Sequence, residues 1–349
     1  MITSPIDINS TTFNDDFDLS KATVGQVGYG FIGNAVVELF RDHVGKILIY
    51  DKAKVPTKFG NLELCASLDP VVASAEVIFV AVPTPMKPSG ECHTGIVESV
   101  LQDIQNAALK MARQLENFVV VLKSTVPPGF TRRMQDKYAL RLVFSPEFLT
   151  EAHAVKDFRT TNRVLMGGDL EDALVLKKYF EGVWPDRLIG TYVDHKDGPV
   201  ALIHCEPGEA EMVKLSTNIH LTSKVMVSNE LYLICQKLGI DYDNVRIMTQ
   251  LDRRIGLSHM NVPGPDGLRG VSGSCFPKDL NSLAFLSEQL ECSTPRQCGA
   301  SGCVPGETSL FREMFERNVI IRGQKDWEQL TGRAIVDSDA GEKGIKSKD

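Results

Sequence analysis

The residues best suited to covalent chemistry lie in the stretch 270–280, which reads Gly-Val-Ser-Gly-Ser-Cys-Phe-Pro-Lys-Asp-Leu. Cys275 is followed by Pro277 and then by apolar residues at helical spacing. Because proline fits the first turn of a helix, Cys275 should lie just before one. The N–H groups and the dipole at a helix start favour an anion, and Lys278 adds a positive charge. This pattern predicts a reactive thiolate, against the alternative of a buried free cysteine.

A glycine-rich turn predicts a dinucleotide site near the start of the chain. Residues 22–27 read as a short apolar strand, and a helical pattern runs over 35–40. Between them lies G-x-G-x-x-G, in which the first glycine makes the turn, the second lets the backbone approach a pyrophosphate, and the third allows the helix to pack. The expected cofactor-binding residues here are Gly28, Gly30, Phe31, Ile32 and Gly33.

An acidic residue completes this pattern. Asp51 ends the next strand, 46–50, about twenty residues beyond the glycines, where a carboxylate can bind the ribose hydroxyls of the cofactor. The same carboxylate would repel a 2′-phosphate, so we predict NAD as the cofactor in preference to NADP. Lys52 and Lys54 weaken this preference without removing it.

Polar residues also follow three further strands, which we predict over 75–82, 118–123 and 140–144. Open parallel sheets bind ligands outside the carboxyl ends of their strands. Single serines and threonines at such places are often only turn or cap residues, and solvated surface is the alternative for the glutamates. The candidates at this edge are Thr84, Ser124, Thr125, Glu147 and Glu151.

The elements that must position these residues predict an α/β protein. We expect a Rossmann-type, doubly wound parallel sheet over 21–205, then a long connecting helix and a second, all-helical domain over 206–330. Residues 1–20 read as a flexible leader and 331–349 as a disordered tail. The helix, about 207–238, carries Lys214 and Asn218 four positions apart and therefore on one face, although a solvated pair is the alternative.

Composition narrows the function classes. A chain of 349 residues, 43% hydrophobic and 24% charged, is typical of a globular protein of about two domains. The net charge of -7 argues against a nucleic-acid partner. Neither a signal peptide nor a membrane-length apolar run is present, so we expect a cytoplasmic protein without a membrane partner. Cys292, Cys298 and Cys303 cluster without a zinc-ligand spacing, and we expect no metal.

Several separate motifs make the chain resemble the nucleotide-sugar dehydrogenases over about 24–326. The matching segments are Gly28-Tyr-Gly30-Phe-Ile-Gly33, Val82-Pro-Thr-Pro85, Ser124-Thr-Val-Pro-Pro-Gly129, Pro146-Glu-Phe-Leu149, Lys214 with Asn218, Arg254-Ile-Gly256 and Cys275-Phe-Pro-Lys-Asp279. The resemblance implies the oxidation of a sugar C6 alcohol by NAD⁺ through an aldehyde, which Cys275 attacks to form a thiohemiacetal and then a thioester. It implies UDP-glucose as the substrate and a homodimer through the central helical region.

The resemblance also assigns roles to individual residues. Lys214 and Asn218 would stabilise the oxyanion. Asp279, Thr125 and Glu147 would handle water and protons, and Glu151 and Lys278 would lie at the cofactor. The expected substrate-binding residues are Glu147, Phe148, Leu149, Lys214, Asn218, Arg254, Ser272, Gly273 and Phe276.

The chain departs from the family pattern at several positions. Ser272 stands where the family has a glycine, Val271 replaces a common aromatic residue, and Pro56 replaces a basic one. The family's third, C-terminal domain is also expected to be missing. Two alternatives stay open: a two-electron NAD-dependent hydroxy-acid dehydrogenase, which needs no cysteine, and an NAD-binding pseudoenzyme.

Overall fold

The computed structural model describes residues 6–7, 17–54, 57–184, 200–293 and 309–336. The chain forms two compact units. The first unit comprises Met1–Pro83 and Thr94–Lys214, and the second comprises Thr84–His93 and Leu215–Asp349. The division therefore falls inside the long helix, directly after Lys214, whereas the sequence placed it before the helix. The loop 84–93 also belongs to the second unit.

Among its described residues, the first unit is built on one ten-stranded sheet with the order β1-β10-β9-β8-β7-β6-β2-β3-β5-β4. Its six central strands, from β8 to β5, are parallel. Counted along the chain they lie in the order 3-2-1-4-5-6, which is that of dinucleotide-binding sheets. The predicted Rossmann-type sheet is confirmed. The strands are β1 (Ile6–Asp7), β2 (Thr23–Val27), β3 (Lys46–Tyr50), β4 (Lys58–Phe59), β5 (Leu62–Leu64), β6 (Val77–Val80), β7 (Val119–Leu122), β8 (Leu142–Phe144), β9 (Arg163–Gly167) and β10 (Ala201–Cys205).

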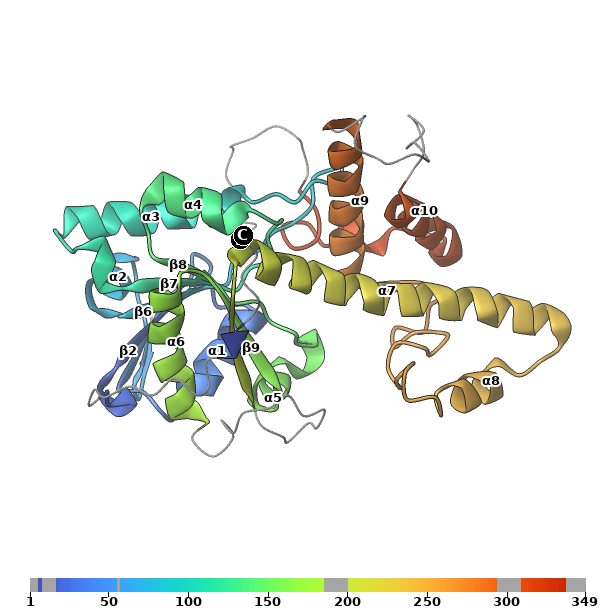
Figure 1. The fold of residues 1–349 in the computed structure, drawn as a ribbon, viewed down its shortest axis with the longest axis horizontal. Coiled ribbons are helices and arrows are strands. Elements are labelled where there is room, and N and C mark those ends of the chain that lie inside the picture. The colour runs from blue at the N-terminus through green and yellow to red at the C-terminus, as the bar shows by residue number, and fades with distance from the viewer. Residues whose placement is uncertain (1–5, 8–16, 55–56, 185–199, 294–308, 337–349) are drawn as a thin grey trace. The chain divides into compact units, whose positions relative to one another are not determined.

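Helices cover both faces of this sheet (Figure 1). One apolar core lies under α1 (Phe31–Phe40), α5 (Ala154–Arg159) and α6 (Leu170–Val183). The other lies under α2 (Asp69–Ser74), α3 (Gly95–Lys110) and α4 (Phe130–Tyr138). Strands buried on both faces must be apolar throughout, as in the Val-Ile-Phe-Val of β6 and the Val-Val-Val-Leu of β7. Short 3-10 turns are η1 (Leu19–Lys21), η2 (Leu115–Asn117) and η3 (Glu151–His153).

The second unit is helical, as predicted, in the part that the structure describes. It contains α7 (Pro207–Leu238) beyond Lys214, α8 (Tyr242–Thr249), α9 (Phe276–Ser293), α10 (Leu310–Arg322) and the 3-10 turn η4 (Asp326–Gln329). Its main core has Trp327 at its centre, 1% exposed, and joins residues of α7, α9 and α10. Within the described residues, no helix is long and apolar enough to span a membrane.

Two parts of the predicted termini are ordered, which corrects the sequence-based expectation. Ile6–Asp7, in the expected leader, pairs with β10 as an edge strand. Ala334, in the expected tail, is fully buried and its carbonyl accepts a hydrogen bond from Met86 N. Both segments are held by backbone partners far away in sequence, which no local pattern reveals. Pro56, Cys298, Cys303, the side chain of Cys292 and residues 337–349 lie outside the described residues.

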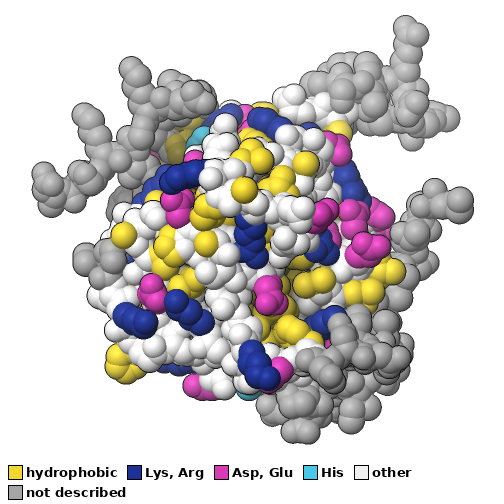
Figure 2. Space-filling view, turned by 90° about the vertical axis from the view of Figure 1, so that its left-hand side faces the viewer, with side chains coloured by type: hydrophobic (Ala, Val, Ile, Leu, Met, Phe, Trp, Pro, Cys, Tyr) yellow, Lys and Arg dark blue, Asp and Glu magenta, His cyan; other side chains and the backbone are white. Residues whose placement is uncertain are grey.

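Charged side chains of both signs are mixed on the face that Figure 2 shows, among apolar and uncharged ones. Ion pairs within the first unit include Lys110 with Asp69 and Arg132 with Asp169.

Candidate active site

The glycine loop has the geometry that a dinucleotide requires. Gly28 has a φ of +84°, and a Cβ there would lie 2.3 Å from the carbonyl oxygen of Ala81. A Cβ on Gly33 would lie 2.1 Å from the carbonyl oxygen of Gly28. A Cβ on Gly30, in contrast, would have no described atom within 4 Å. Gly28 and Gly33 thus serve the turn and the packing of α1, whereas Gly30 keeps the space in front of the helix open.

The start of α1 fits a pyrophosphate. Gly30 is the N-cap residue, and no side chain in the described part of the chain caps it. Phe31 and Ile32 form the first turn, where backbone N–H groups lack partners within the helix. An anion bound there would receive these hydrogen bonds and the helix dipole.

Asp51 lies beside the same loop, as predicted. Its carboxylate accepts hydrogen bonds from Tyr29 N at 2.6 Å and from Ala53 N at 2.8 Å. Sequence reasoning missed Gln26, which is fully buried and donates from Nε2 to the carbonyl oxygen of Gly28 at 2.8 Å. A glutamine inside an apolar strand just before the glycines is the signal that could have identified it.

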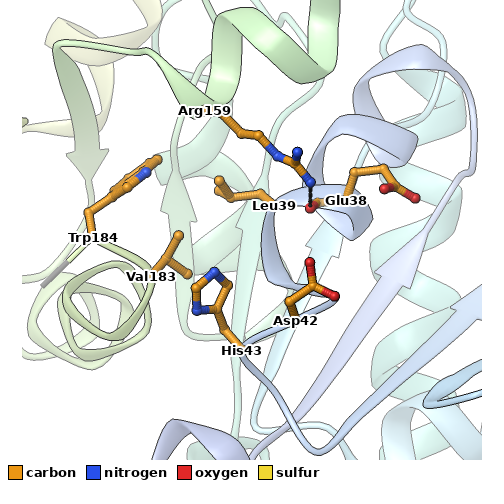
Figure 3. A pocket seen from close by; sticks show the side chains of 7 residues that line it. All are labelled: Glu38, Leu39, Asp42, His43, Arg159, Val183 and Trp184. Carbon is orange, nitrogen blue, oxygen red and sulfur yellow. Dashed lines mark hydrogen bonds between the residues drawn. The ribbon is translucent and has the colours of Figure 1, made fainter. Parts of the chain in front are cut away.

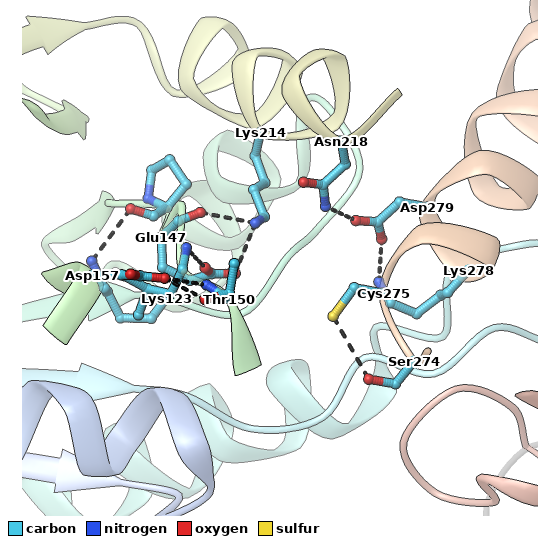
Figure 4. Close-up of polar contacts among 12 residues, drawn as sticks. Lys123, Glu147, Thr150, Asp157, Lys214, Asn218, Ser274, Cys275, Lys278 and Asp279 are labelled. Carbon is cyan, nitrogen blue, oxygen red and sulfur yellow. Dashed lines mark hydrogen bonds and ion pairs between the residues drawn. The ribbon is translucent and has the colours of Figure 1, made fainter. Parts of the chain in front are cut away.

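A buried ion pair lies at the ends of the strands of the first unit. Lys214 Nζ donates to Glu147 Oε1 at 2.7 Å and to the backbone carbonyl of Glu147 at 2.8 Å. Leu149 N donates to the other carboxylate oxygen at 2.7 Å. Lys214 also lies over the ring of Phe148, 5.8 Å from its centroid. The predicted residues Glu147, Phe148, Leu149 and Lys214 are therefore one connected group, of which Figure 4 shows Glu147 and Lys214.

Lys123, which sequence reasoning did not single out, belongs to this group. It follows β7, is 1% exposed, and its Nζ lies 3.3 Å from Ser145 Oγ and 3.4 Å from the carbonyl oxygen of Pro146. Burial lowers the pKa of Lys123 to about 7; the carboxylate of Glu147 opposes this shift and the ammonium of Lys214 adds to it. A lysine directly after four apolar strand residues was the available signal.

The predicted strand-end residues Ser124 and Thr125 differ in setting. The hydroxyl of Ser124 is buried, accepts from Val82 N at 2.9 Å and donates to Val82 O at 2.7 Å, which ties β6 to β7. Ser124 therefore has a structural role. Thr125 is half-buried in the loop that leads to α4.

Glu211, also missed, anchors that loop. Its buried carboxylate accepts from Gly129 N at 2.5 Å, Thr131 N at 2.8 Å and Thr131 Oγ1 at 2.6 Å. Burial raises the pKa of Glu211, and these hydrogen bonds oppose that shift. Glu211 lies one turn before Lys214 on α7, so the helix that carries Lys214 is fastened to the start of α4.

In the second unit, α9 begins at Phe276, directly after Cys275, where the sequence placed a helix start. Cys275 is half-buried, and its Sγ lies 3.7 Å from Ser274 Oγ. Lys278 is buried and forms an ion pair with Asp279. Although burial opposes its charge, the Asp279 carboxylate and the sulfurs of Cys92 and Cys275 raise the pKa of Lys278. A permanent positive charge near Cys275 favours its thiolate.

Asn218 completes this second group. Its Nδ2 donates to Asp279 Oδ2 at 2.6 Å, and both side chains are buried. One carboxylate oxygen of Asp279 thus accepts a hydrogen bond from Asn218, and the other accepts one from Lys278 (Figure 4). The sequence could not show that these three residues form one hydrogen-bonded group.

The loop before Cys275 is held by side chains of α7 and α10. Gly270 N donates to Asn229 Oδ1 at 2.9 Å, and Val271 N donates to Asn318 Oδ1 at 2.7 Å. Although burial opposes it, hydrogen bonds from Arg322 and Ser272 lower the pKa of Asp266. Ser272, which stands where the resemblance expects glycine, therefore has a polar partner in its own loop.

The remaining predicted residues differ in their surroundings within their own units. Thr84 is buried in the second unit, and Phe276 packs against His259 with ring centroids 5.6 Å apart. Gly273 and Glu151 are exposed. The side chain of Arg254 is 89% exposed and pairs with Asp252 at 2.6 Å.

A cavity of about 150 Å³ in the first unit is not part of the predicted site (Figure 3). It lies at the carboxyl end of α1, whereas the glycine loop lies at the amino end of that helix. Its lining residues are Glu38, Leu39, Asp42, His43, Arg159, Val183 and Trp184. Within the described part of the chain, no cluster of metal-ligating side chains is found.

The strand order, the glycine loop and Asp51 define the first unit as the NAD-binding domain of a dehydrogenase. Comparison with known proteins identifies the family of dehydrogenases. The NAD-binding domain model of the UDP-glucose/GDP-mannose dehydrogenase family matches residues 45–182, and the central domain model matches residues 208–299. The chain belongs to this family.

Individual relatives agree with this assignment. The chain is 30% identical to a UDP-glucose 6-dehydrogenase of Bacillus subtilis over 67% of its own length and 50% of the relative's. It is 30% identical to a UDP-glucose 6-dehydrogenase of Rhizobium meliloti over 78% of its length and 62% of the relative's. It therefore spans between about half and two thirds of these relatives.

Solved structures share the fold. A UDP-glucose dehydrogenase from Pyrobaculum islandicum superposes with a TM-score of 0.64 at 24% identity, over 86% of this chain and 68% of that one. A GDP-mannose dehydrogenase from Pseudomonas aeruginosa gives a TM-score of 0.55 at 22% identity, over 85% and 68% of the two chains.

Proposed function

We propose that the chain carries out the NAD-dependent, four-electron oxidation of a nucleotide sugar, converting the C6 alcohol of UDP-glucose to the carboxylate of UDP-glucuronate. The observation that carries this proposal is the group at the start of α9, where Cys275 lies beside the buried, hydrogen-bonded residues Lys278, Asp279 and Asn218. A two-electron dehydrogenase needs no such cysteine. Family membership and the names of the relatives support the same substrate class.

The cofactor residues of the first unit fit NAD. Gly30 and the open start of α1 would hold the pyrophosphate, and Asp51 would hold the ribose. Bound NAD⁺ supplies the hydride acceptor, one cofactor molecule being reduced in each of two successive oxidations. The protein must orient the sugar, retain the aldehyde between the two oxidations and manage the protons.

Cys275 is the residue proposed to retain the aldehyde. Its thiolate adds to the aldehyde carbon, forming a C–S bond, and the resulting oxyanion takes a proton to give a thiohemiacetal. Oxidation converts this adduct to a thioester. Water then breaks the C–S bond, which releases the carboxylate and restores the thiol. One alcohol, two NAD⁺ and one water thus give one carboxylate, two NADH and three protons.

Stabilisation of the oxyanion is assigned to Lys214 and Asn218. They lie four residues apart on the continuous helix α7 and therefore share a helix face. Each is held by a carboxylate, Lys214 by Glu147 and Asn218 by Asp279, so neither side chain needs to reorient during the reaction. Preorganised donors of this kind stabilise developing negative charge.

Proton transfer and water activation are assigned to Glu147, Asp279 and Thr125. Binding of the sugar nucleotide is assigned to Arg254, Ser272, Gly273 and Phe276. Lys278 and Glu151 are proposed to contact the cofactor. The ion pair of Lys278 with Asp279 supports a second contribution, because its charge also favours the thiolate of Cys275.

NADH formation with UDP-glucose, GDP-mannose and UDP-N-acetylmannosamine tests the proposal. We expect two NADH per UDP-glucose and no acid product from Cys275→Ser. Cys235→Ser, at a buried thiol in another core cluster, is the matched control and should stay active. One NADH per sugar, or turnover unaffected by Cys275→Ala, would instead support a two-electron dehydrogenase. NAD⁺ binding without any turnover would identify a pseudoenzyme.

We also propose that the protein is a homodimer that functions in the cytoplasm, where thiols stay reduced. The support for a dimer is an apolar stripe on the second half of α7. Its residues are spaced four, three and four apart, so they share one face. They are Val227, Leu231, Ile234 and Leu238, which are 58%, 41%, 52% and 66% exposed.

Sedimentation equilibrium tests whether two copies of the chain associate through this stripe. Ile234→Glu should give a monomer, because it places a charge in the centre of the stripe. Leu109→Glu, at a similarly exposed leucine on α3, is the control and should leave the dimer intact. A monomeric wild-type protein at micromolar concentration would contradict the proposal.

A further inference from the structure

Lys123 is a buried cation to which the proposed mechanism assigns no role. Within the described residues it forms no ion pair, in contrast to Lys177, which is equally buried but pairs with Glu181. Its hydrogen-bond partners are uncharged: Ser145 Oγ and the carbonyl oxygen of Pro146. The ring of Phe158, with its centroid 4.9 Å from Nζ, covers another side. An unpaired buried ammonium is costly, and groups of this kind concentrate at functional sites.

The partners of Lys123 indicate what it does. Ser145 and Pro146 are the two residues before Glu147, and Glu147 offers both its backbone carbonyl and its carboxylate to Lys214. A shift of the backbone at 145–146 would therefore move both acceptors of Lys214 at once. Lys123 reaches this backbone from the end of β7, an element fixed on both faces by the apolar cores.

We propose that Lys123 is a positioning residue that fixes the segment 145–147 on the sheet, so that Glu147 holds Lys214 in the orientation needed to stabilise the oxyanion. This inference rests on the proposed function. Lys123 itself does not touch the substrate, the cofactor or the reacting atoms, and it acts through Glu147 and Lys214.

The charge of Lys123 should make kcat depend on pH. The charged groups that face Lys123 are Glu147 and Lys214, while Ser145, directly after β8, and Phe158 from α5 are uncharged. Loss of the Lys123 proton removes one positive charge beside the Glu147–Lys214 pair, which lowers the positive potential where the oxyanion forms. Because burial lowers the pKa of Lys123 to about 7, kcat should fall with pH around neutrality.

Kinetics of two variants test the role. Lys123→Met keeps the length of the side chain but removes the donor, and we expect kcat for UDP-glucose to fall roughly ten- to a hundredfold while the KM for NAD⁺ stays unchanged. Lys123→Arg stays charged and should keep, even at alkaline pH, the kcat of the acid form. Both variants should lose the pH limb near neutrality. Lys137→Met, at a half-exposed lysine of α4, is the control for lysine removal.

Lysine-selective NMR of the protein without substrate gives a readout that is independent of turnover. The Lys123 signal, assigned by its loss in Lys123→Met, should titrate near neutrality. Its midpoint should rise in Lys214→Met, which removes a neighbouring cation, and fall in Glu147→Gln, which removes the carboxylate. Unchanged midpoints in both variants would overturn the proposed contact, whether or not the enzyme is active.

The two readouts separate the two hypotheses. Coupled NMR midpoints together with no NADH from any nucleotide sugar would refute the proposed function and support the electrostatic coupling of Lys123 to the Glu147–Lys214 pair. NADH formation with wild-type kcat and an unchanged pH profile in Lys123→Met would refute the positioning role and leave the function intact.

Discussion

Replacing Lys123 by methionine should stabilise the first unit at acid pH and stabilise it less as the pH rises. Burial lowers the pKa of Lys123 from 10.5 to about 7. Between these two values the unfolded chain binds more protons than the folded one, so the stability of the wild type rises with pH over this window. Below about pH 7 the full cost of burying the ammonium is present.

The size of the effect follows from that pKa difference. A difference of about 3.5 units corresponds to about 5 kcal/mol of folding free energy below pH 7. By about pH 9 most of this cost is relieved, and about 2 kcal/mol remains for deprotonating the amine. The variant also loses two long hydrogen bonds, at 3.3 and 3.4 Å, worth about 1 kcal/mol each at any pH. The stability difference between the variant and the wild type should therefore shrink by about 3 kcal/mol between about pH 6 and about pH 9.

Urea unfolding followed by tryptophan fluorescence measures this difference. The chain has two tryptophans, Trp184 in the first unit and Trp327 in the second, so a Trp327→Phe background reports on the first unit alone. The matched control is Lys177→Met, which leaves the carboxylate of Glu181 without that ammonium and should destabilise the protein. A Lys123→Met variant less stable than the wild type at about pH 6, or a difference independent of pH, would refute the reasoning.

Three further predictions address the two units separately. Gly30→Ala should fold normally but bind NAD⁺ at least tenfold more weakly by calorimetry, because its Cβ would occupy the open space at the start of α1. Gly28→Ala should instead destabilise the fold, because its Cβ would meet the backbone at 2.3 Å. Asn218→Ala should lower kcat by roughly ten- to a thousandfold with a smaller change in KM, because it removes an oxyanion donor and a hydrogen bond to Asp279; equal losses in binding and turnover would argue against that role. Asn318→Ala should raise the KM for the nucleotide sugar but leave NAD⁺ affinity unchanged, because it frees Val271 in the loop before Cys275; a parallel loss of NAD⁺ affinity would show that the variant disturbs the whole fold.

Local patterns were sufficient for the dinucleotide-binding part of the site. The turn at Gly28, the start of α1 and the carboxylate of Asp51 depend on residues near one another in sequence or on a fixed strand–helix–strand order. The position of Cys275 directly before α9 was predictable for the same reason, since Pro277 marks a helix start within three residues. Backbone geometry of this kind is encoded locally by glycine and proline.

Long-range partners were not predictable in the same way. Lys214 and Asn218 were recognised on one helix face, but their carboxylate partners, Glu147 and Asp279, lie 67 and 61 residues away along the chain. Lys123 and Glu211 were missed altogether, because a lysine after a strand and a glutamate in a helix are ordinary until their burial is known. The edge strand at Ile6–Asp7 and the packed Ala334 were missed because their partners are backbone atoms, which carry no signal in the sequence.

The sequence by itself determined the type of sheet, the glycine loop and the helix that starts after Cys275, because these features follow from short periodicities and from residues with restricted backbone angles. The tertiary structure alone decided which charges are buried together: Lys123 with Glu147 and Lys214, and Lys278 with Asp279 and Asn218. Burial removes water from a charged group and makes its interactions with neighbours strong. That step depends on which elements pack against each other, and it converts ordinary polar residues into the two candidate catalytic groups.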